Sequence, residues 1–160
     1  MVLWGRPRLT ADVDITVQLV PEDTAGFCAD MERAGFRLRV RDRDAFPART
    51  RPLPFVHPTT RLPLDVVLAG PGLEEQFLDR AVPVDIEGVS VPVISPEDLV
   101  VVKIFAGRPK DLEDARSVLV ERGGTLDRER IRSTLAMGDL LPLFESLSCS
   151  IRARSGGANL

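Results

Sequence analysis

The sequence predicts an α+β fold with a helical C-terminal part. Over residues 1–94, short segments of alternating polar and apolar residues are mixed with amphipathic helical segments, and after residue 95 only helical patterns remain. Strict alternation is the period of a half-buried strand, whereas apolar residues three or four apart mark one face of a helix. We therefore expect a small mixed β-sheet with flanking helices over residues 1–94, a helical part over 95–147 packed on it, and a disordered tail over 148–160.

The composition is that of a globular protein of one domain. The chain has 160 residues, 44% hydrophobic and 28% charged, with a net charge of −3, which excludes a broadly basic nucleic-acid coat but not a local basic patch. Cys28 and Cys149 lie outside metal-ligand spacing, and His57 is the one histidine, which excludes most histidine-based metal sites. No signal peptide or membrane-spanning run is visible, so we expect a cytoplasmic protein without a membrane partner.

Local patterns predict the elements of the first part. A proline followed by two acids at residues 21–23 is typical of a helix start, and Gly35 of a helix end. A turn at Glu87-Gly88 joins two short apolar segments into a hairpin, whose prolines favour edge strands. The expected strands are residues 12–19, 36–40, 55–57, 62–68, 82–86 and 89–93, the expected helices are 21–34 and 73–81, and residues 41–51 are expected to form a loop.

The second part begins with a strong helix signal. Residues 95–98, Ser-Pro-Glu-Asp, combine a capping residue, a first-turn proline and an acid three residues after the cap. Gly107 and Pro109 break this helix, and a glycine pair at 123–124 ends the next one. We expect helices over residues 95–106, 110–122, 127–136 and 140–147.

Three carboxylates are the first candidates for chemistry. Asp12 and Asp14 alternate with apolar residues, so on a strand they point to the same face. Asp65 interrupts an otherwise apolar strand, where a buried carboxylate without a partner is costly. If the two strands are neighbours, the three carboxylates converge and can hold two divalent ions for an in-line displacement at phosphorus. The alternative is that each aspartate is a solvated strand-end residue or a turn cap.

The signature around these carboxylates resembles that of a known superfamily. Residues 5–14, Gly-Arg-Pro-Arg-Leu-Thr-Ala-Asp-Val-Asp, resemble the hG-x-P-R-x-T-x-D-x-D signature of the nucleotidyltransferases typified by DNA polymerase β. Within that superfamily the chain is most similar to minimal bacterial nucleotidyltransferases, including the AbiEii-like toxins of type IV toxin–antitoxin systems. The resemblance continues through residues 64–68, 95–99 with Lys103, and 108–114, and covers roughly residues 5–135.

The resemblance implies a sheet of the nucleotidyltransferase type and a Mg²⁺- or Mn²⁺-dependent reaction. A nucleotide would pass from a nucleoside triphosphate to a hydroxyl of an RNA, such as tRNA, or of a protein. Asp12 and Asp14 would hold both ions, and Asp65 would hold the ion that activates the acceptor hydroxyl. Arg8 and Thr10 would orient the loop or contact phosphate.

The resemblance also gives roles to residues of the second part. Lys103 and Lys110 are the two lysines of a chain that otherwise uses arginine, and they would neutralise phosphate charge. Asp111 and Asp114 would position Lys103 or the acceptor. The alternatives are that acids in a first turn stabilise the helix dipole, that Lys103 lies along a helix flank, and that the two lysines cluster by chance.

One feature of the superfamily is missing before Asp12. Its members place a Gly-Gly or Gly-Ser pair at a helix start there, where backbone amides bind the phosphates. Only residues 1–11 precede Asp12, and Gly5 is the one glycine among them. Either the helix is encoded upstream of Met1, or the chain is a degenerate member.

Two other functions therefore remain open. The first is a catalytically inactive, truncated binding module of the same fold, acting by contact with a cognate antitoxin or toxin chain. The second is a metal-dependent nuclease that uses the same three carboxylates.

Overall fold

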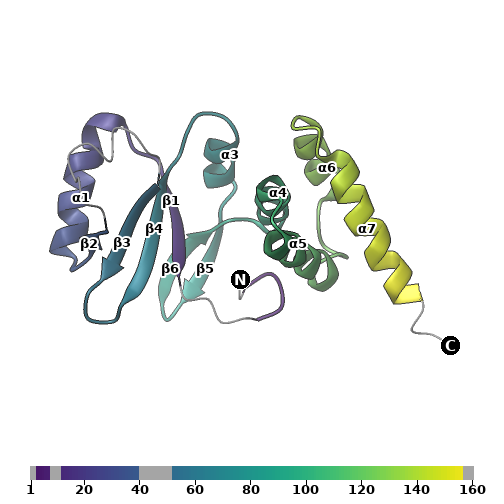
Figure 1. Cartoon of the computed structure of the whole chain (residues 1–160), viewed down its shortest axis with the longest axis horizontal. Helices are drawn as coiled ribbons and strands as arrows, with labels where there is room; N and C mark the ends of the chain where they lie inside the picture. The colour runs from purple at the N-terminus through teal and green to yellow at the C-terminus, as the bar shows by residue number, and fades with distance from the viewer. Residues whose placement is uncertain (1–2, 8–11, 40–51, 157–160) are drawn as a thin grey trace. The chain divides into compact units, whose positions relative to one another are not determined.

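The fold is α+β, as the sequence predicts. The computed structural model describes residues 3–7, 12–39 and 52–156, with backbone alone for 152–156. The chain divides into two compact units: the described part of residues 10–79, and the described parts of residues 1–9 and 80–160. Strands and helices are mixed in the first unit, and helices predominate in the second (Figure 1). The predicted loop at 41–51 lies outside the described residues.

The first unit is built on a four-stranded mixed sheet. Its strands are β1 (Val13–Val17), β2 (Arg37–Leu38), β3 (Pro52–His57) and β4 (Leu62–Leu68), in the order β1-β4-β3-β2. β1 and β4 are parallel, whereas β3 is antiparallel to both β4 and β2. The 3-10 turn η1 (Pro21–Asp23) and helix α1 (Thr24–Arg33) follow β1, and α3 (Leu73–Asp79) follows β4.

One face of this sheet forms the core of the first unit. Its buried side chains come from alternate positions of the two central strands, and partly buried apolar residues of β1 and α1 pack against them. The buried residues are Leu53, Phe55, Leu64 and Val66, and the residues packed on them include Ile15, Val17, Phe27, Cys28, Met31 and Leu38. Because side chains alternate along a strand, the residues between these positions face the other way.

The second unit joins a hairpin to four helices. The hairpin strands are β5 (Val82–Ile86) and β6 (Val89–Val93), and both turn residues, Glu87 and Gly88, have positive φ. This is the type I′ geometry, whose twist matches that of paired strands. The helices are α4 (Pro96–Ala106), α5 (Pro109–Glu121), α6 (Arg128–Ala136) and α7 (Leu141–Gly156).

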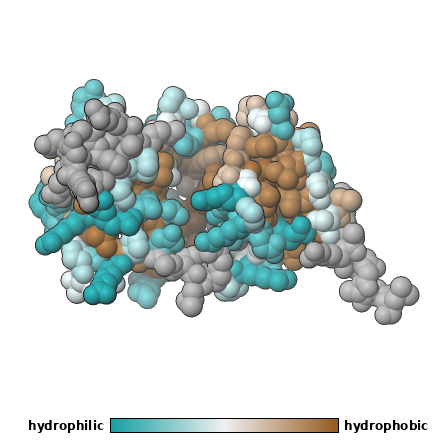
Figure 2. Space-filling model, viewed as in Figure 1, coloured by the Kyte–Doolittle hydropathy of each residue, from teal (hydrophilic) through white to brown (hydrophobic). Residues whose placement is uncertain are grey.

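The helices of the second unit share an apolar core. Its fully buried side chains are Val100, Ile104, Ala115, Val118, Ile131, Leu135 and Phe144. Other apolar side chains of this unit stay exposed, including Phe105 at 42% and Met137 at 69%. Figure 2 shows hydrophobic residues gathered over these helices on the face in view. In the part of the chain that is described, no helix is long and apolar enough to cross a membrane.

Two boundaries differ from those that the sequence suggested. α7 continues to Gly156, so residues 148–156 are helical where the sequence suggested a disordered tail. Phe144 and Leu147 are buried and Ile151 is half-buried, which continues an apolar stripe at helical spacing through a stretch rich in serine and arginine. The compact units also separate between Asp79 and Arg80, whereas the sequence placed a boundary at 94–95. Residues 157–160 lie outside the described part.

Two leucines on neighbouring strands test this core. Leu53 is fully buried and Leu62 is 40% exposed. We expect Leu53→Ala to lower the free energy of unfolding by about 2–5 kcal/mol, because it leaves a cavity. Leu62→Ala should cost less than about 1 kcal/mol. Urea unfolding followed by circular dichroism measures both, and equal losses would contradict the assignment of the core face.

Candidate functional site

The polar face of the first unit's sheet carries Asp14 and Asp65, and Asp12 directly precedes its first strand. β1 and β4 pair in a register that sets Asp14 opposite Asp65, and Asp12 lies two residues before Asp14. Ile15 and Val66 pack in the core on the other face. The side chains of paired residues on neighbouring strands share a face, as do those two apart on one strand. The two strands are therefore neighbours, which is the condition that the sequence set for convergence of the carboxylates.

Asp65 has a partner that the sequence patterns did not single out. The Nη2 atom of Arg39 donates a hydrogen bond to Asp65 Oδ1 at 2.9 Å, and the two side chains are 42% and 39% exposed. The backbone N–H of Arg39 also donates to the carbonyl of Pro54, which continues the pairing of β2 with β3. The alternation of residues 36–40 was the available signal, because it puts Arg37 and Arg39 on the polar face.

The donor chemistry of this face fits a hard divalent cation. All three candidate ligands are carboxylates, and oxygen ligands are what Mg²⁺ and Mn²⁺ prefer. As the described side chains lie, however, no three His, Cys, Asp or Glu are gathered closely enough to hold an ion. Binding at Asp12, Asp14 and Asp65 therefore requires side-chain rearrangement. Arg8 and Thr10, the other predicted site residues near this strand, lie outside the described residues.

A second polar cluster joins α4 to α5. The ammonium of Lys103 lies 2.9 Å from Asp111 Oδ1 and 3.1 Å from Asp114 Oδ2. Asp111 also accepts a hydrogen bond from Arg108. Both aspartates are buried, at 2% and 6% exposure, and three residues apart on α5 they share a face. The structure thus brings together the three residues of the predicted positioning group, whereas Lys110 is exposed.

Hydrogen bonding within this cluster governs its protonation. Burial favours the neutral amine of Lys103, but hydrogen bonds to Asp111 and Asp114 and the charges of both outweigh burial and raise its pKa. The hydrogen bond from Arg108 lowers the pKa of Asp111, and the bond from Lys103 and both positive charges act in the same direction against burial. Lys103 is therefore a fixed cation held by two carboxylates.

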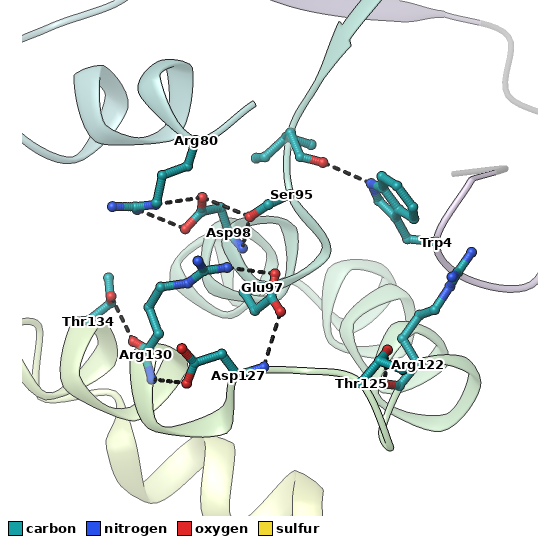
Figure 3. Close-up of polar contacts among 11 residues, drawn as sticks. Trp4, Arg80, Ser95, Glu97, Asp98, Arg122, Thr125, Asp127, Arg130 and Thr134 are labelled. Atoms are coloured by element: carbon teal, nitrogen blue, oxygen red, sulfur yellow. Dashed lines mark hydrogen bonds and ion pairs between the residues drawn. The ribbon is translucent and has the colours of Figure 1, made fainter. Parts of the chain in front are cut away.

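Capping and buried ion pairs hold α4, the helix that carries Lys103 (Figure 3). Ser95 Oγ accepts from the backbone N–H of Asp98, as the sequence predicts for this helix start. Arg80 donates two hydrogen bonds to the Asp98 carboxylate, at 2.9 and 3.1 Å. Glu97 pairs with Arg130 of α6 at 2.6 Å. Each buried acid of the first turn thus has an arginine partner, which fixes the helix start.

The segment of residues 3–7 packs within the second unit. The indole Nε1 of Trp4 donates to the carbonyl of Ile94 at 2.8 Å, and the Arg122 guanidinium lies 5.2 Å from the ring centroid (Figure 3). The backbone N–H of Arg6 donates to Ser117 Oγ of α5 at 2.6 Å. These contacts hold the chain shortly before the Asp12–Asp14 strand.

Comparison with protein families gives the identity of the fold. Residues 7–140 match the model of a family described as a nucleotidyltransferase of unknown function (DUF6036). The chain belongs to this nucleotidyltransferase family. The match includes β1, β4 and the helices that carry both lysines, and it confirms the superfamily that the motifs indicated. Similarity to the AbiEii-like toxins stays a prediction. No curated protein matches the chain.

The candidate site residues of this nucleotidyltransferase belong to different units. Asp12, Asp14 and Asp65 lie in the first unit, and Lys103 and Lys110 lie in the second. Each group is defined by contacts or register within its own unit. Their roles toward metal and phosphate stay predictions.

The two lysines allow a matched test of the buried cluster. Lys103→Met should lower the free energy of unfolding by about 2–4 kcal/mol near neutral pH, because two buried carboxylates lose their shared cation. Lys110→Met, at an exposed position, should change it by less than about 0.5 kcal/mol. Urea unfolding of the two variants and the wild type measures the difference.

The pH dependence of this difference follows from the pKa shifts. Asp111 has a lowered pKa in the folded state, so its stabilising contribution is present above about pH 4 and is lost as pH falls through the folded pKa. Lys103 has a raised pKa, so its contribution persists to about pH 10 and is lost only above it. The difference in the free energy of unfolding between wild type and Lys103→Met should therefore become smaller in acid. A gap that widens in acid would contradict the ion-pair assignment.

Proposed function

We propose that this nucleotidyltransferase moves a nucleotide from a nucleoside triphosphate to a hydroxyl of an RNA, with tRNA as the first acceptor to test, or of a protein. The observation that supports the proposal is the in-register pairing of Asp14 with Asp65 on parallel strands, with Asp12 directly before the first of them. A family match over residues 7–140 supports the general class of reaction.

The proposed reaction is an in-line displacement at the α-phosphorus. The acceptor oxygen forms a bond to phosphorus, the bond to the β-phosphate oxygen breaks, pyrophosphate leaves, and the hydroxyl proton passes to solvent. Mg²⁺ or Mn²⁺ at Asp12, Asp14 and Asp65 would supply acceptor activation and neutralisation of phosphate charge. Asp12 and Asp14 would hold both ions, and Asp65 the one nearest the acceptor.

Cationic side chains of the chain would hold the phosphates. Lys110 is exposed and available to a phosphate group. Lys103 is 20% exposed and paired with two carboxylates, so any phosphate contact would share its charge with them. Arg8 and Thr10 are proposed to contact phosphate or orient the loop on the strength of the sequence signature alone.

The motif resemblance extends the proposal to a toxin–antitoxin pair. Its support is the order and spacing of the motifs around Asp12, Asp65 and Lys103. Induced expression of the chain should then arrest growth, and Asp12→Asn should abolish the arrest. Growth unaffected by abundant wild-type protein would count against a toxin role.

A binding module without catalysis is the second candidate. It is favoured by the Arg39–Asp65 ion pair and by the absence, among the described residues, of three side chains gathered to hold a metal. The exposed Phe105 and Met137 of the second unit are apolar surface of the kind that protein partners cover.

Transfer of labelled nucleotide tests the proposed reaction. Wild-type protein incubated with labelled nucleoside triphosphates, Mg²⁺ and total tRNA should label RNA or protein. Asp12→Asn and Asp65→Asn should each lower the rate at least about a hundredfold, because each removes a ligand that stabilises charge in the transition state.

Asp23→Asn is the matched control for the loss of one carboxylate. Asp23 is an exposed residue of the same unit whose side chain caps no helix. The control should transfer at the wild-type rate. Absence of transfer by the wild type, together with no stabilisation by Mg²⁺, would support the binding module, and cleavage of RNA or DNA instead would support the nuclease.

A further inference from the structure

Four residues of the first unit form one row across the polar face of its sheet. Asp14 lies opposite Asp65, Asp65 lies opposite Pro54, and Arg39 bonds through its backbone to Pro54. The row therefore crosses β1, β4 and β3 and ends at the residue that follows β2, in the order of the sheet, β1-β4-β3-β2 (Figure 1). The core residues Leu38 and Phe55, which are next to Arg39 and Pro54 along their strands, face the other way. Charge is thus arranged with a cation at one end of the row and two carboxylates at the other.

The small side chain of Pro54 allows Arg39 and Asp65, which lie on either side of it, to form an ion pair. Arg39 and Asp65 are two strands apart, and strand spacing sets their backbones about 10 Å from each other. The short ring of Pro54 is the side chain between them, so the long arginine can pass over it to reach Asp65. The observed distance of 2.9 Å from Nη2 to Oδ1 shows that it does.

The Arg39–Asp65 pair is open to exchange. Its two side chains are 42% and 39% exposed, so solvent and ions reach both. An exposed ion pair shifts an equilibrium by at most about fivefold. A divalent ion that binds several carboxylates at once can therefore displace the guanidinium from Asp65. The ion pair then lowers the apparent affinity for that ion.

We propose that Arg39 is an internal cation that competes with the divalent metal for Asp65. While the guanidinium holds Asp65, one oxygen of this carboxylate is bonded to Arg39, and no three ligating side chains are gathered among the described residues. Metal binding requires Asp65 to leave Arg39. The inference rests on the proposed function for its metal, but not on any transfer reaction.

Titration of the full chain with MnCl₂ alone, at constant ionic strength, tests the competition. Arg39→Ala and Arg39→Gln should each bind Mn²⁺ about two- to fivefold tighter than wild type, because the competing cation is gone. Arg39→Lys, which keeps the charge, should bind within about twofold of wild type. Isothermal titration calorimetry measures the affinities, and circular dichroism checks that each variant is folded.

Arg37→Ala is the matched control for loss of one positive charge. Arg37 lies two residues before Arg39 on the same face of β2, and it makes no ion pair with a described residue. Its removal should change Mn²⁺ affinity by less than about twofold if only the specific contact counts. In the Asp65→Asn background, Arg39→Ala should give no gain, since the carboxylate for which it competes is absent.

Four results would overturn the proposal. They are an unchanged affinity in Arg39→Ala, an equal gain in Arg37→Ala, a gain that persists with Asp65→Asn, and failure of all variants to bind Mn²⁺. Nucleotide transfer by the wild type is measured separately, so tighter metal binding without transfer would refute the proposed function and keep the role of Arg39. Transfer by the wild type, together with an unchanged Mn²⁺ affinity in Arg39→Ala, would support the proposed function and refute the role of Arg39.

Discussion

The parallel pairing of β1 with β4 is the constraint on which the candidate site depends. Parallel strands cannot be joined by a tight turn, so the chain must leave β1 and return through a long crossover. Here the crossover contains α1, β2 and β3, and its apolar residues cover the core face. A slip of β4 by one residue would bury Asp65 and expose Leu64, at the cost of the core. The hydrophobic pattern that folds this unit therefore also sets Asp14 beside Asp65.

The second unit buries charged side chains within its helices. Asp98, Glu97 and Asp111 are buried acids, and each is paired with a basic side chain. Removal of either partner of such a pair leaves a buried charge without its counterion, which is strongly destabilising, although the intact pair adds little net stability. An arginine is found where one guanidinium donates to both oxygens of a single carboxylate, as Arg80 does to Asp98. A lysine stands where one compact charge lies between two carboxylates.

Local patterns predicted the faces of the strands, but not which strands would be neighbours. Once residues 12–17 and 64–68 are assigned to strands, the side chains that share a face are known, because that depends on the period of two alone. The contact of Arg39 with Asp65 depends on strand order and on Pro54 lying between them, and neither is encoded locally. The adjacency of the two carboxylate strands was therefore only a condition at the level of sequence, and the pairing of β1 with β4 fulfils it.

Helix limits show the same division between local and non-local information. The start of α4 was predictable, because Ser95 and Asp98 form their cap within four residues. The end of α7 was not, because serine and arginine dominate its last turns and the apolar stripe through Leu147 and Ile151 is sparse. Packing of an amphipathic face, rather than intrinsic propensity, supplies most of the stability of a helix of this kind.

Trp4 gives the protein an optical property of its own. It is the one tryptophan, and the chain contains no tyrosine, so intrinsic fluorescence comes from a single indole. That indole is bonded to the carbonyl of Ile94 and lies against the Arg122 guanidinium, two contacts that set its emission. It sits eight residues before Asp12, in the segment that leads to β1. Emission from the unlabelled protein therefore reports, without an added dye, whether that segment stays docked when nucleotide or metal is added.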